Sequence, residues 1–573
     1  MIESRKGLVG VIPYPVPSTT RKDKLRFDLN ENNFGCSPKV LRAIKSASKS
    51  DLLIYPEYEK LENKIAEIFE IQRSNVLLTN GGDDAIRSVI DTFLDRKDEI
   101  IIPVPTYSMF ELYAKLREAK IKEVLYHKDF SFPFRKVIKS ITHRTKMIVV
   151  VNPASPLGTS ITKQELVDLL EKLKDIIVLL DETYYHFSGK SNASLVKEYE
   201  NLVVVHTFSK VYGLAGLRIG NIIANENVIN EISKVAFPYA ATSIAVSAAY
   251  AALSDKEYTE KVVKQIEEEK KFLCNELKPV AEKVYNTDTN FIIANFGKYA
   301  NDLHEKLEEK GILVKNISRL PLMEGFLRIS PGLRKENIKL VKTINELMPP
   351  EAILFDMDGV LVDVDLSYRM AIKKTAEFFV KEEISFDEIQ SYKDKGGYND
   401  DWNLTEAIIL SRKKKITKIG IINIFQQFYL GRDFDGFIQN EQLIIDPHIL
   451  EKISEDFKLG IVSGRPRKEL DYTLKRFKIS KYFDVTISMD DTKDKGKPDP
   501  YGINLALKAL KSNRAVYIGD TIDDVIAAKA AGIIPIAILP DNATNYKKRK
   551  DRFIKFGAKH ILQNANEVYG ILK

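Results

Sequence analysis

Hydrophobic and polar residues follow two kinds of pattern along this chain. Short runs that are apolar throughout recur between longer stretches whose apolar residues are three or four positions apart. The short runs predict strands buried on both faces, as in parallel sheets, and the longer stretches predict the helices that cover them. The predicted strands are Val76–Leu78, Ile100–Ile102, Met147–Val151, Ile176–Leu180, Leu202–Val205, Ala352–Phe355, Leu459–Val462, Ala515–Ile518 and Ile534–Ile538. The pattern therefore predicts an α/β fold that occurs twice.

A pair of prolines marks the clearest domain boundary. A helical pattern over Lys335–Leu347 stops at Pro349 and Pro350, and a new strand begins at Ala352. Proline cannot continue a helix, because it lacks the N–H group and clashes with the preceding turn. A chain of 573 residues is also too long for a single core. We therefore predict one domain over residues 1–349 and a second over residues 350–573.

Each predicted domain has a subdivision. In the first, we expect a large lobe over about residues 40–260, and a small lobe formed by the N-terminal segment and about residues 261–349. A long helix over Glu260–Leu277 leads into the small lobe. In the second, about a hundred residues separate Asp358 from Ser463, which is too many for a simple crossover. Helical patterns from Tyr368 to Tyr429 predict an inserted helical cap over about residues 365–445.

Composition and charge narrow the class of protein. A hydrophobic content of 44% and a charged content of 29% are typical of soluble globular proteins. The net charge of +7 is spread along the chain rather than clustered, so we expect no nucleic-acid partner. No apolar run is long enough to span a membrane, and residues 1–20 lack the apolar core of a signal peptide, so we expect a cytoplasmic protein with no membrane partner. Two cysteines exclude a disulfide framework.

The first domain carries the side chains that pyridoxal phosphate (PLP) chemistry requires. A lysine must form the Schiff base, an acid must keep the pyridine nitrogen protonated, and several donors must hold the phosphate. Lys210 follows one predicted strand, Asp181 ends another, and Tyr184 is placed to bond the ring hydroxyl. Thr207, Ser209, Arg218 and the helix start at Gly82 and Asp83 supply phosphate donors, and Tyr107 is expected to stack on the ring.

In order and spacing these residues resemble class I and II aminotransferases of PLP fold type I, most closely the histidinol-phosphate aminotransferase branch. The segments Asp28–Gly35, Tyr55-Pro56 and Phe326–Ser330 resemble three further elements of that branch. The resemblance implies a fold of large and small lobes, with Asn30 and Arg328 binding the substrate and Arg328 holding its anionic end. It also implies that Tyr55 reaches the PLP phosphate of a partner subunit, so we expect a homodimer formed through this domain.

One loop departs from the family pattern. Asn152-Pro153-Ala154-Ser155-Pro156-Leu157-Gly158 resembles a family loop that contacts the cofactor, which implies cofactor-binding roles for Asn152 and Ser155. Ser155 stands where the family has an asparagine that contacts the ring hydroxyl. A serine hydroxyl can donate a similar hydrogen bond from a shorter side chain. The sequence leaves open how this exchange affects turnover.

The second domain carries the groups that phosphoryl transfer through a carboxylate requires. Asp356 follows the predicted strand Ala352–Phe355 and can act as the nucleophile, and Asp358 can protonate the leaving oxygen and then activate water. Ser463 and Lys497 can hold the phosphoryl group of the substrate. Asp520 and Asp524 add oxygen ligands suited to Mg²⁺.

These four segments resemble the motifs of the haloacid dehalogenase (HAD) superfamily, subfamily I. They are Asp356-Met357-Asp358-Gly359, Val462-Ser463-Gly464-Arg465, Lys497-Pro498-Asp499-Pro500 and Gly519-Asp520-Thr521-Ile522-Asp523-Asp524. The resemblance implies a Rossmannoid phosphatase domain with a helical cap, in which Asp356, the Asp358 carbonyl and Asp520 reach the metal. For Arg465 and Arg467, contact with substrate and a solvated helix start remain equally open.

Joining the two halves gives our leading hypothesis. The first domain would transfer an amino group from glutamate to imidazole-acetol phosphate, giving histidinol phosphate and 2-oxoglutarate, and the second would hydrolyse histidinol phosphate to histidinol. These are consecutive steps of histidine biosynthesis on one small phosphorylated metabolite. The assignment of the second step rests on the fusion, because HAD motifs do not name a substrate.

Three alternatives remain. An aminoethylphosphonate transaminase could be joined to a phosphonatase, but the phosphonatase branch lacks the second aspartate that Asp358 represents. An aromatic aminotransferase could be joined to a general small-metabolite phosphatase. The second domain could also be a non-catalytic module, although the presence of Asp356 argues against that. The amino donor, the substrate of the phosphatase, the assembly beyond a dimer and the passage of intermediate between the sites are not determined by the sequence.

Overall fold

The computed structural model describes residues 8, 20–393, 400–412, 416–493, 495–512 and 514–572. Residues 1–20, which are expected to lack a signal peptide, lie outside the described residues except for Leu8 and Thr20. Residues 394–399 and 413–415 of the expected cap also lie outside them. The chain divides into two compact units, Met1–Met348 and Pro349–Lys573. Within the part that the structure describes, no helix combines the length and apolarity needed to cross a membrane. Each unit is an α/β structure, which confirms the predicted fold class.

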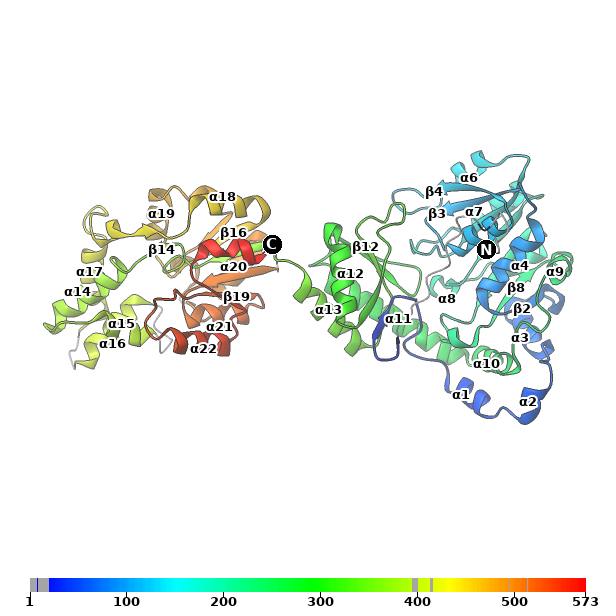
Figure 1. Ribbon diagram of the computed structural model, residues 1–573, viewed down its shortest axis with the longest axis horizontal. Helices are drawn as coiled ribbons and strands as arrows, with labels where there is room; N and C mark the ends of the chain where they lie inside the picture. The colour runs from blue at the N-terminus through cyan, green and yellow to red at the C-terminus, as the bar shows by residue number, and fades with distance from the viewer. Residues whose placement is uncertain are drawn as a thin grey trace, which may run out of the picture. The chain divides into compact units, whose positions relative to one another are not determined.

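The N-terminal unit is built on a seven-stranded sheet with the order β2-β8-β7-β6-β5-β3-β4 (Figure 1). All five strands predicted for this domain are present. The strands are β2 (Val76–Thr79), β3 (Glu99–Val104), β4 (Lys120–Leu125), β5 (Thr145–Val151), β6 (Ile177–Asp181), β7 (Leu202–Thr207) and β8 (Gly220–Ala224). The five predicted strands run in the same direction, whereas β8, which was not among them, runs antiparallel to its neighbours β2 and β7.

Both faces of this sheet are buried, as the uniformly apolar strands predicted. Alternate residues of one strand enter different cores, so that Val149 packs into one hydrophobic cluster and Val150 into the other. One face is covered by α4 (Gly81–Phe93), α5 (Met109–Leu116) and α9 (Glu226–Ser233). The opposite face is covered by α3 (Glu59–Phe69), α6 (Phe134–Ser140), α7 (Lys163–Lys172) and α10 (Ser243–Leu253).

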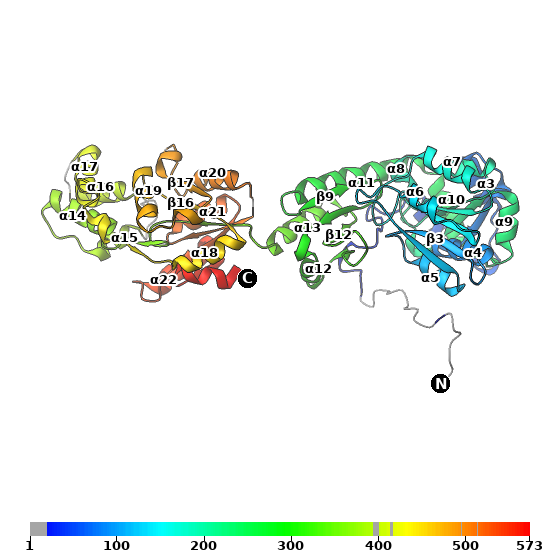
Figure 2. The same ribbon diagram turned by 90° about the horizontal axis from the view of Figure 1, so that it is seen from above.

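A five-stranded sheet forms the smaller lobe of this unit, with the order β1-β11-β12-β10-β9. The N-terminal strand β1 (Leu25–Phe27) pairs with β11 (Ile312–Asn316), so the N-terminal segment joins a sheet whose other strands come from the C-terminal part of the unit. The other strands are β9 (Lys283–Asn286), β10 (Ile292–Asn295) and β12 (Phe326–Ile329). The long helix α11 (Lys256–Leu277) leads into this lobe, and α12 (Ala300–Glu309) and α13 (Arg334–Leu347) pack on the sheet (Figure 2).

Short helices complete the N-terminal unit. They are α1 (Pro38–Lys45), α2 (Lys49–Leu53) and α8 (Tyr185–Ser188). The Ser48 side chain caps α2, and Asp51 returns a bond to the Ser48 backbone N–H, which fixes this short helix although none of its residues is buried. An exposed helix of this kind is held by its cap rather than by a core.

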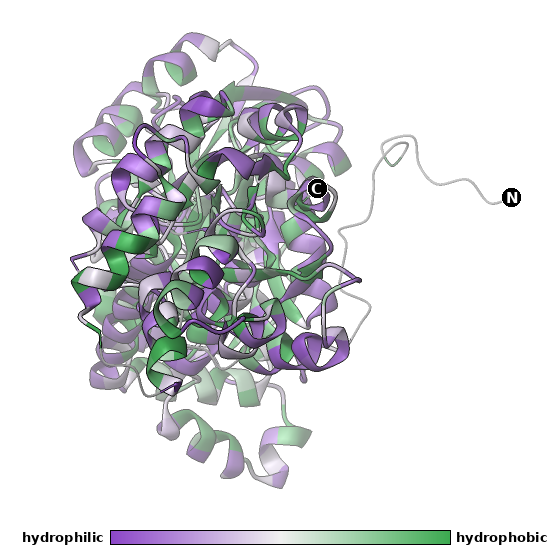
Figure 3. Ribbon diagram, turned by 90° about the vertical axis from the view of Figure 1, so that its left-hand side faces the viewer, coloured by the Kyte–Doolittle hydropathy of each residue, from purple (hydrophilic) through white to green (hydrophobic). Residues whose placement is uncertain are grey.

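The C-terminal unit is built on a six-stranded parallel sheet with the order β17-β16-β13-β18-β19-β20. The four strands predicted for this domain are all present. The strands are β13 (Ala352–Phe355), β16 (Lys458–Val462), β17 (Val485–Ile487), β18 (Ala515–Gly519), β19 (Ile534–Ile538) and β20 (His560–Leu562). Helices cover both faces: α18 (Pro447–Asp456), α19 (Arg467–Arg476), α20 (Tyr501–Leu510), α21 (Ile522–Ala530), α22 (Tyr546–Phe556) and α23 (Val568–Leu572). Figure 3, coloured by hydropathy, shows helices banded in purple and green, as expected when one face of a helix is apolar.

In the described part of the chain, four helices form an insertion after β13. They are α14 (Tyr368–Val380), α15 (Phe386–Lys393), α16 (Asp401–Ser411) and α17 (Lys418–Tyr429), and they lie together in Figure 1. The insertion leaves and rejoins the core through the two-stranded pair of β14 (Val362–Asp363) and β15 (Gln442–Leu443). It occupies the place at which the sequence predicts a helical cap.

Candidate active sites

Lys210 lies just after the end of β7 and points to the N-terminal segment. Its Nζ donates a hydrogen bond to the carbonyl oxygen of Leu29 at 3.1 Å and lies 6.0 Å from the centroid of the Tyr184 ring. The carboxyl ends of parallel strands meet at one edge of a sheet, where ligands of α/β proteins bind. The predicted Schiff-base lysine is therefore half-buried at the ligand-binding edge of the seven-stranded sheet.

Tyr184 and Asn30 meet beside this lysine, although they are far apart in the sequence. Asn30 Nδ2 donates to the Tyr184 hydroxyl at 2.7 Å, and the Asn30 side-chain oxygen accepts a bond from Ser330 Oγ at 2.9 Å. Asn290 Nδ2 holds the Asn30 backbone carbonyl at 2.9 Å. Asn30 is buried with φ 55, in the left-handed region that asparagine tolerates better than most residues. The predicted cofactor residue and the predicted substrate residue thus belong to one buried cluster.

Asp181 is the last residue of β6 and is only 5% exposed. One of its carboxylate oxygens accepts a hydrogen bond from the Thr183 N–H at 2.9 Å. Burial raises the pKa of Asp181 because the ionised form loses its hydration. A cationic partner would stabilise the ionised form, and a protonated pyridine nitrogen is such a partner.

The start of α4 forms a polar cradle with the segment after β7. Asp83 accepts one hydrogen bond from the Tyr107 hydroxyl at 2.8 Å and another from Arg218 Nη2 at 2.9 Å. Thr207 Oγ1 donates to Ser209 Oγ at 2.9 Å. A Cβ atom added to Gly82 would meet the Thr207 side chain at 3.7 Å, so the helix start and the Thr207 segment are adjacent. The cradle combines a helix N-terminus, two hydroxyls and a guanidinium, which is a donor set suited to a phosphate group.

A close backbone approach supports the cradle. A Cβ atom at Gly220 would lie 2.8 Å from the carbonyl carbon of Gly81 and 2.8 Å from the carbonyl oxygen of His206. Only glycine permits β8 to pass this near to the start of α4. The position of the helix N-terminus therefore depends on this residue.

Arg328 connects the smaller lobe to the predicted cofactor loop. Its Nη2 donates to the Asp28 carbonyl at 2.8 Å and its Nη1 lies 3.5 Å from Ser155 Oγ. The Asn152 side chain turns elsewhere, because its oxygen accepts the Ile161 N–H at 3.0 Å. Ser155 is thereby placed next to the predicted substrate arginine, whereas Asn152 organises its own loop.

Tyr55 is the predicted residue that the single chain does not bring to this site. The residue is 72% exposed, and its ring stacks on that of Tyr239 with centroids 4.2 Å apart. Leu52, Leu53, Ile54 and Phe237 are also exposed, with fractions between 58% and 72%. We call this group, together with Tyr55 and Tyr239, the exposed apolar patch.

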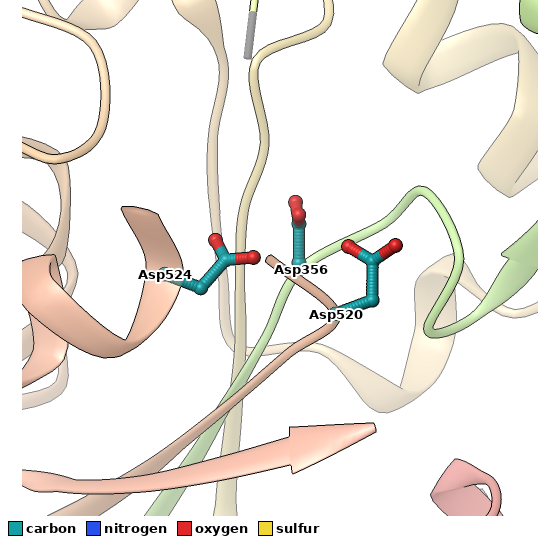
Figure 4. A group of neighbouring side chains, drawn as sticks. All are labelled: Asp356, Asp520 and Asp524. Carbon is teal, nitrogen blue, oxygen red and sulfur yellow. The ribbon is translucent and has the colours of Figure 1, made fainter. Parts of the chain in front are cut away.

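In the C-terminal unit, three carboxylates from different elements converge. Asp356 follows β13, Asp520 follows β18, and Asp524 lies in the first turn of α21. A carboxylate oxygen from each lies within 4.8 Å of the others, and Figure 4 shows the three side chains next to one another, with Asp356 between Asp524 and Asp520. Oxygen ligands in this number suit a hard divalent cation such as Mg²⁺. The donor set fits the predicted metal.

Crowding of these carboxylates shifts their protonation. Burial, with the nearby charges of Asp524, Asp358 and Asp520, raises the pKa of Asp356 well above its usual range. Burial and the charge of Asp524 raise the pKa of Asp520 to about 6. A cation at their centre would counter both effects.

Lys497 supplies a fixed positive charge to the cluster. Its Nζ lies 2.8 Å from Asp356 Oδ2 and 2.6 Å from Asp524 Oδ1, and it donates to the Tyr517 hydroxyl at 3.0 Å. Asp524 is held in turn by Thr521, because the two residues form the capping box of α21. The local sequence that starts the helix therefore also fixes a predicted metal ligand.

Asp358 points away from the three-carboxylate cluster. Its Oδ1 accepts hydrogen bonds from Arg465 Nε at 2.8 Å and Nη2 at 2.6 Å. Gly359 follows with φ +72, and a Cβ there would come 2.4 Å from an Asp520 oxygen, so the turn requires glycine for two reasons. Asp358 thus faces the same cavity as the nucleophile without joining the cluster through its side chain.

A cavity of about 930 Å³ lies between these residues and the insertion. Asp356, Asp358, Ser463, Lys497 and Asp520 line one side. The other side is lined by insertion residues, among them Arg369, Lys393, Asp401, Trp402 and Lys418. Lys393 Nζ pairs with Asp401 Oδ1 at 3.1 Å. The four predicted HAD motifs therefore meet in one cavity that the helical insertion covers.

The structure decides a question that the sequence leaves open for Arg465 and Arg467, and it adds Glu441, which the sequence does not indicate. Arg465 is not at a solvated helix start, because α19 begins at Arg467 and the Arg465 side chain is fully buried. Arg467 instead binds Thr486 and Asp491 and is absent from the cavity wall. Glu441, the second partner of Arg465, carried no signal, since a lone glutamate in a connecting segment matches no motif.

Comparison with protein families agrees with the two units. A family model described as "Aminotransferase class I and II" matches residues 22–344, and one described as "Haloacid dehalogenase-like hydrolase" matches residues 353–538. The first match spans more than half of the chain. The second lies wholly inside the C-terminal unit.

Known proteins resemble the N-terminal unit. The histidinol-phosphate aminotransferase of Caldanaerobacter subterraneus subsp. tengcongensis is 30% identical over 354 residues, which are 61% of this chain and 100% of that protein. That of Clostridium novyi is 31% identical over 345 residues, 59% of this chain and 96% of that protein. The crystal structure of the Clostridium acetobutylicum histidinol-phosphate aminotransferase aligns with a TM-score of 0.53 and 23% identity, covering 56% of this chain and 98% of that one. A Sinorhizobium meliloti histidinol-phosphate aminotransferase solved with pyridoxal-5'-phosphate aligns with a TM-score of 0.53, 23% identity and 56% and 91% coverage. The two structural matches share the fold of the unit.

Proposed function

This chain belongs to the aminotransferase class I and II family, and we propose that it joins histidinol-phosphate transamination to hydrolysis of the product's phosphate. The N-terminal unit would transfer an amino group from glutamate to imidazole-acetol phosphate. The C-terminal unit, a HAD-like hydrolase domain, would then convert histidinol phosphate to histidinol. Both reactions act on one phosphorylated metabolite, which gives a chemical reason for the fusion.

In the proposed transaminase, Lys210 would hold PLP, and Asp181 would face the ring nitrogen. PLP acts as an electron sink for the carbon that loses or gains the amino group. The start of α4, Thr207, Ser209 and Arg218 would bind its phosphate. Tyr184 beside Lys210 suits the ring hydroxyl, and Arg328 suits an anionic group on the substrate.

In the proposed phosphatase, Asp356 attacks the phosphorus atom and the ester bond to the alcohol oxygen breaks. Asp358, which faces the same cavity, donates a proton to the leaving oxygen. Water activated by Asp358 then hydrolyses the aspartyl-phosphate and restores Asp356. Lys497 and Ser463 bind the phosphoryl oxygens, and Asp356, Asp520 and Asp524 would hold Mg²⁺, whose charge stabilises the transferring group.

One observation carries this proposal. A unit that is similar over its whole length to histidinol-phosphate aminotransferases is followed in one chain by a cavity that holds a carboxylate cluster, Lys497 and Asp358. The test incubates purified protein with histidinol phosphate and MgCl₂ and measures phosphate release. Phosphoglycolate and glucose 6-phosphate serve as competing substrates. A clear preference for histidinol phosphate that is lost in Asp356→Asn is expected, and equal turnover of all three esters would refute the substrate assignment.

The transaminase half has an independent test. Protein purified with PLP should show a visible absorbance band that is absent from Lys210→Ala. Addition of glutamate should change the band in the wild type. Imidazole-acetol phosphate should then restore it with formation of histidinol phosphate, whereas restoration by phenylpyruvate alone would favour the aromatic aminotransferase.

We also propose that the protein acts as a homodimer through the exposed apolar patch. Its six large apolar side chains are each at least 55% exposed, and four of them are consecutive in the chain, which is typical of an interface. Burial of the patch against a second copy would carry Tyr55 to the neighbouring subunit. This placement agrees with the role that the family resemblance implies for Tyr55.

A further inference from the structure

Arg465 is the largest fully buried side chain among those described in this protein. A buried guanidinium requires compensation of its charge and hydrogen bonds for its N–H groups. One compensating partner is Asp358, which accepts bonds from both Nε and Nη2 through the single oxygen Oδ1. The Asp358 side chain is 30% exposed, and it lines the cavity. One oxygen is thus held by arginine, while the residue remains open to a substrate.

Arg465 is itself held on its other side. Glu441, which is completely buried, accepts bonds from Arg465 Nη2 at 2.8 Å and Nη1 at 3.1 Å. Arg465 Nη1 also donates to Thr473 Oγ1 at 2.7 Å. The guanidinium therefore has fixed hydrogen-bond partners along two edges, Asp358 at Nε and Nη2 and Glu441 at Nη1 and Nη2. A planar group of this kind transmits its orientation to the carboxylate that it binds.

The insertion supplies the next layer of contacts. Tyr429 of α17 donates its hydroxyl to Glu441 Oε1 at 2.8 Å. The ring of Tyr368 of α14 stacks on Tyr429 with centroids 4.1 Å apart and lies 5.0 Å from the Arg465 guanidinium. Glu441 lies directly before β15, where the insertion rejoins the core. The contacts run from two insertion helices through Glu441 and Arg465 to Asp358.

We propose that Arg465 is a positioning residue that orients Asp358 for proton transfer to the leaving oxygen. Glu441 connects Arg465 to the insertion helices and so holds the guanidinium in place. The inference rests on the proposed phosphatase function. Asp358 must place one oxygen within hydrogen-bond reach of the ester oxygen, and small displacements of such a group reduce the rate strongly. The packing of α14 and α17 therefore helps to fix the position of the Asp358 carboxylate.

The choice of leaving group distinguishes positioning from general support of the fold. An alkoxide needs a proton to leave, whereas p-nitrophenolate leaves without one. Loss of proton transfer should therefore lower kcat/KM for alkyl phosphates selectively, and a loosened fold should lower it for both kinds of ester. The assay compares histidinol phosphate and phosphoglycolate with p-nitrophenyl phosphate, in the full chain with MgCl₂.

Arg465→Met should lower the ratio of alkyl to aryl kcat/KM by about 10-fold or more. Asp358→Asn removes the proton donor itself and should lower this ratio most, by about 100-fold or more. Glu441→Gln should lower the ratio by a smaller factor. Because Arg465→Met leaves Glu441 buried without its cation, the double variant Arg465→Met with Glu441→Gln tests the same point with both charges removed. Near-ultraviolet circular dichroism and thermal melting establish that each variant is folded.

Arg467→Met is the matched control. It removes the same side chain two residues away, where the guanidinium binds Thr486 and Asp491 outside the cavity wall, and the ratio should not change. An equal loss with all three esters, or an unchanged ratio in the folded double variant, overturns the positioning role while the phosphatase function stands. A wild-type protein that releases phosphate from none of the three esters overturns the proposed function and this inference together.

Discussion

Replacing Lys497 by methionine should destabilise the C-terminal unit by about 3–5 kcal/mol at neutral pH in the absence of divalent ions. Methionine keeps the apolar length of the side chain but removes the ammonium. That ammonium lies 2.8 Å from Asp356 Oδ2 and 2.6 Å from Asp524 Oδ1, and both carboxyl groups are buried. Removal of the common partner leaves uncompensated buried charge, which is the costly way to break an ion pair. For a unit of this size the loss corresponds to a melting temperature lower by about 6–20 °C.

The loss of stability caused by Lys497→Met should increase with pH. The pKa of Asp356 is already raised above its usual range, and Lys497 acts to lower it. Without Lys497 the pKa rises further, so the folded variant binds a proton that the unfolded chain has released. A carboxyl group with a raised pKa in the folded state destabilises the fold as pH rises through and above its unfolded value. The difference between wild type and variant should therefore be small near pH 4 and grow towards pH 8.

The measurement is urea unfolding of EDTA-treated protein at several pH values, followed by a probe of the C-terminal unit such as fluorescence of Trp402, the only tryptophan. Lys495→Met is the matched control, because Lys495 is exposed and contacts neither carboxylate. MgCl₂ should restore part of the lost stability if the cluster binds the ion. Equal stability of Lys497→Met and wild type at pH 8 without metal would refute the reasoning.

Three further predictions follow from the N-terminal unit. Leu53→Asp in the exposed apolar patch should convert a dimer to a monomer in sedimentation equilibrium, whereas Ile419→Asp, at an equally exposed site on the insertion, should not. Gly220→Ala should weaken PLP binding by at least about 10-fold in a titration followed by absorbance, because its Cβ would press on Gly81 at the start of α4; unchanged affinity would contradict the backbone argument. Burial lowers the pKa of His186 from 6.5 to about 3. Between these two values the imidazole is neutral in the folded unit and protonated in the unfolded chain, so the free energy of unfolding should fall as pH is lowered through that interval. His186→Gln should flatten this part of the urea-midpoint profile, and an unaltered slope would contradict the assignment.

The strands and the chemical groups at their ends could be predicted from the sequence. Runs such as Ala352–Phe355 and Met147–Val151 are apolar at every position, which is only favourable in a strand covered on both faces. Asp181 and Asp356 stand at the carboxyl ends of such runs, so their location at the sheet edge follows from the local pattern. The motif order then supported both halves of the candidate chemistry.

Other features depend on contacts between distant parts of the chain. The strand β8 could not be oriented from its own residues, because direction is set by pairing with β2 and β7. Tyr55 lay in a motif, yet its exposure in the single chain became visible only in the structure. Local sequence determines which face of an element is apolar, and packing determines what that face meets.

The contacts between Asp358, Arg465 and Glu441 also depend on bringing distant parts of the chain together. The sequence identified Asp358 by its motif, left Arg465 ambiguous and offered no reason to notice Glu441. Arg465 is 107 residues from Asp358 and 24 residues from Glu441 along the chain. Burial removes water from Arg465 and Glu441 and strengthens the interaction of their charges with each other and with Asp358, but burial is a property of the packed helices and not of any short segment. Local patterns therefore determined the elements and the reacting groups, whereas the tertiary structure alone decided which side chains orient them.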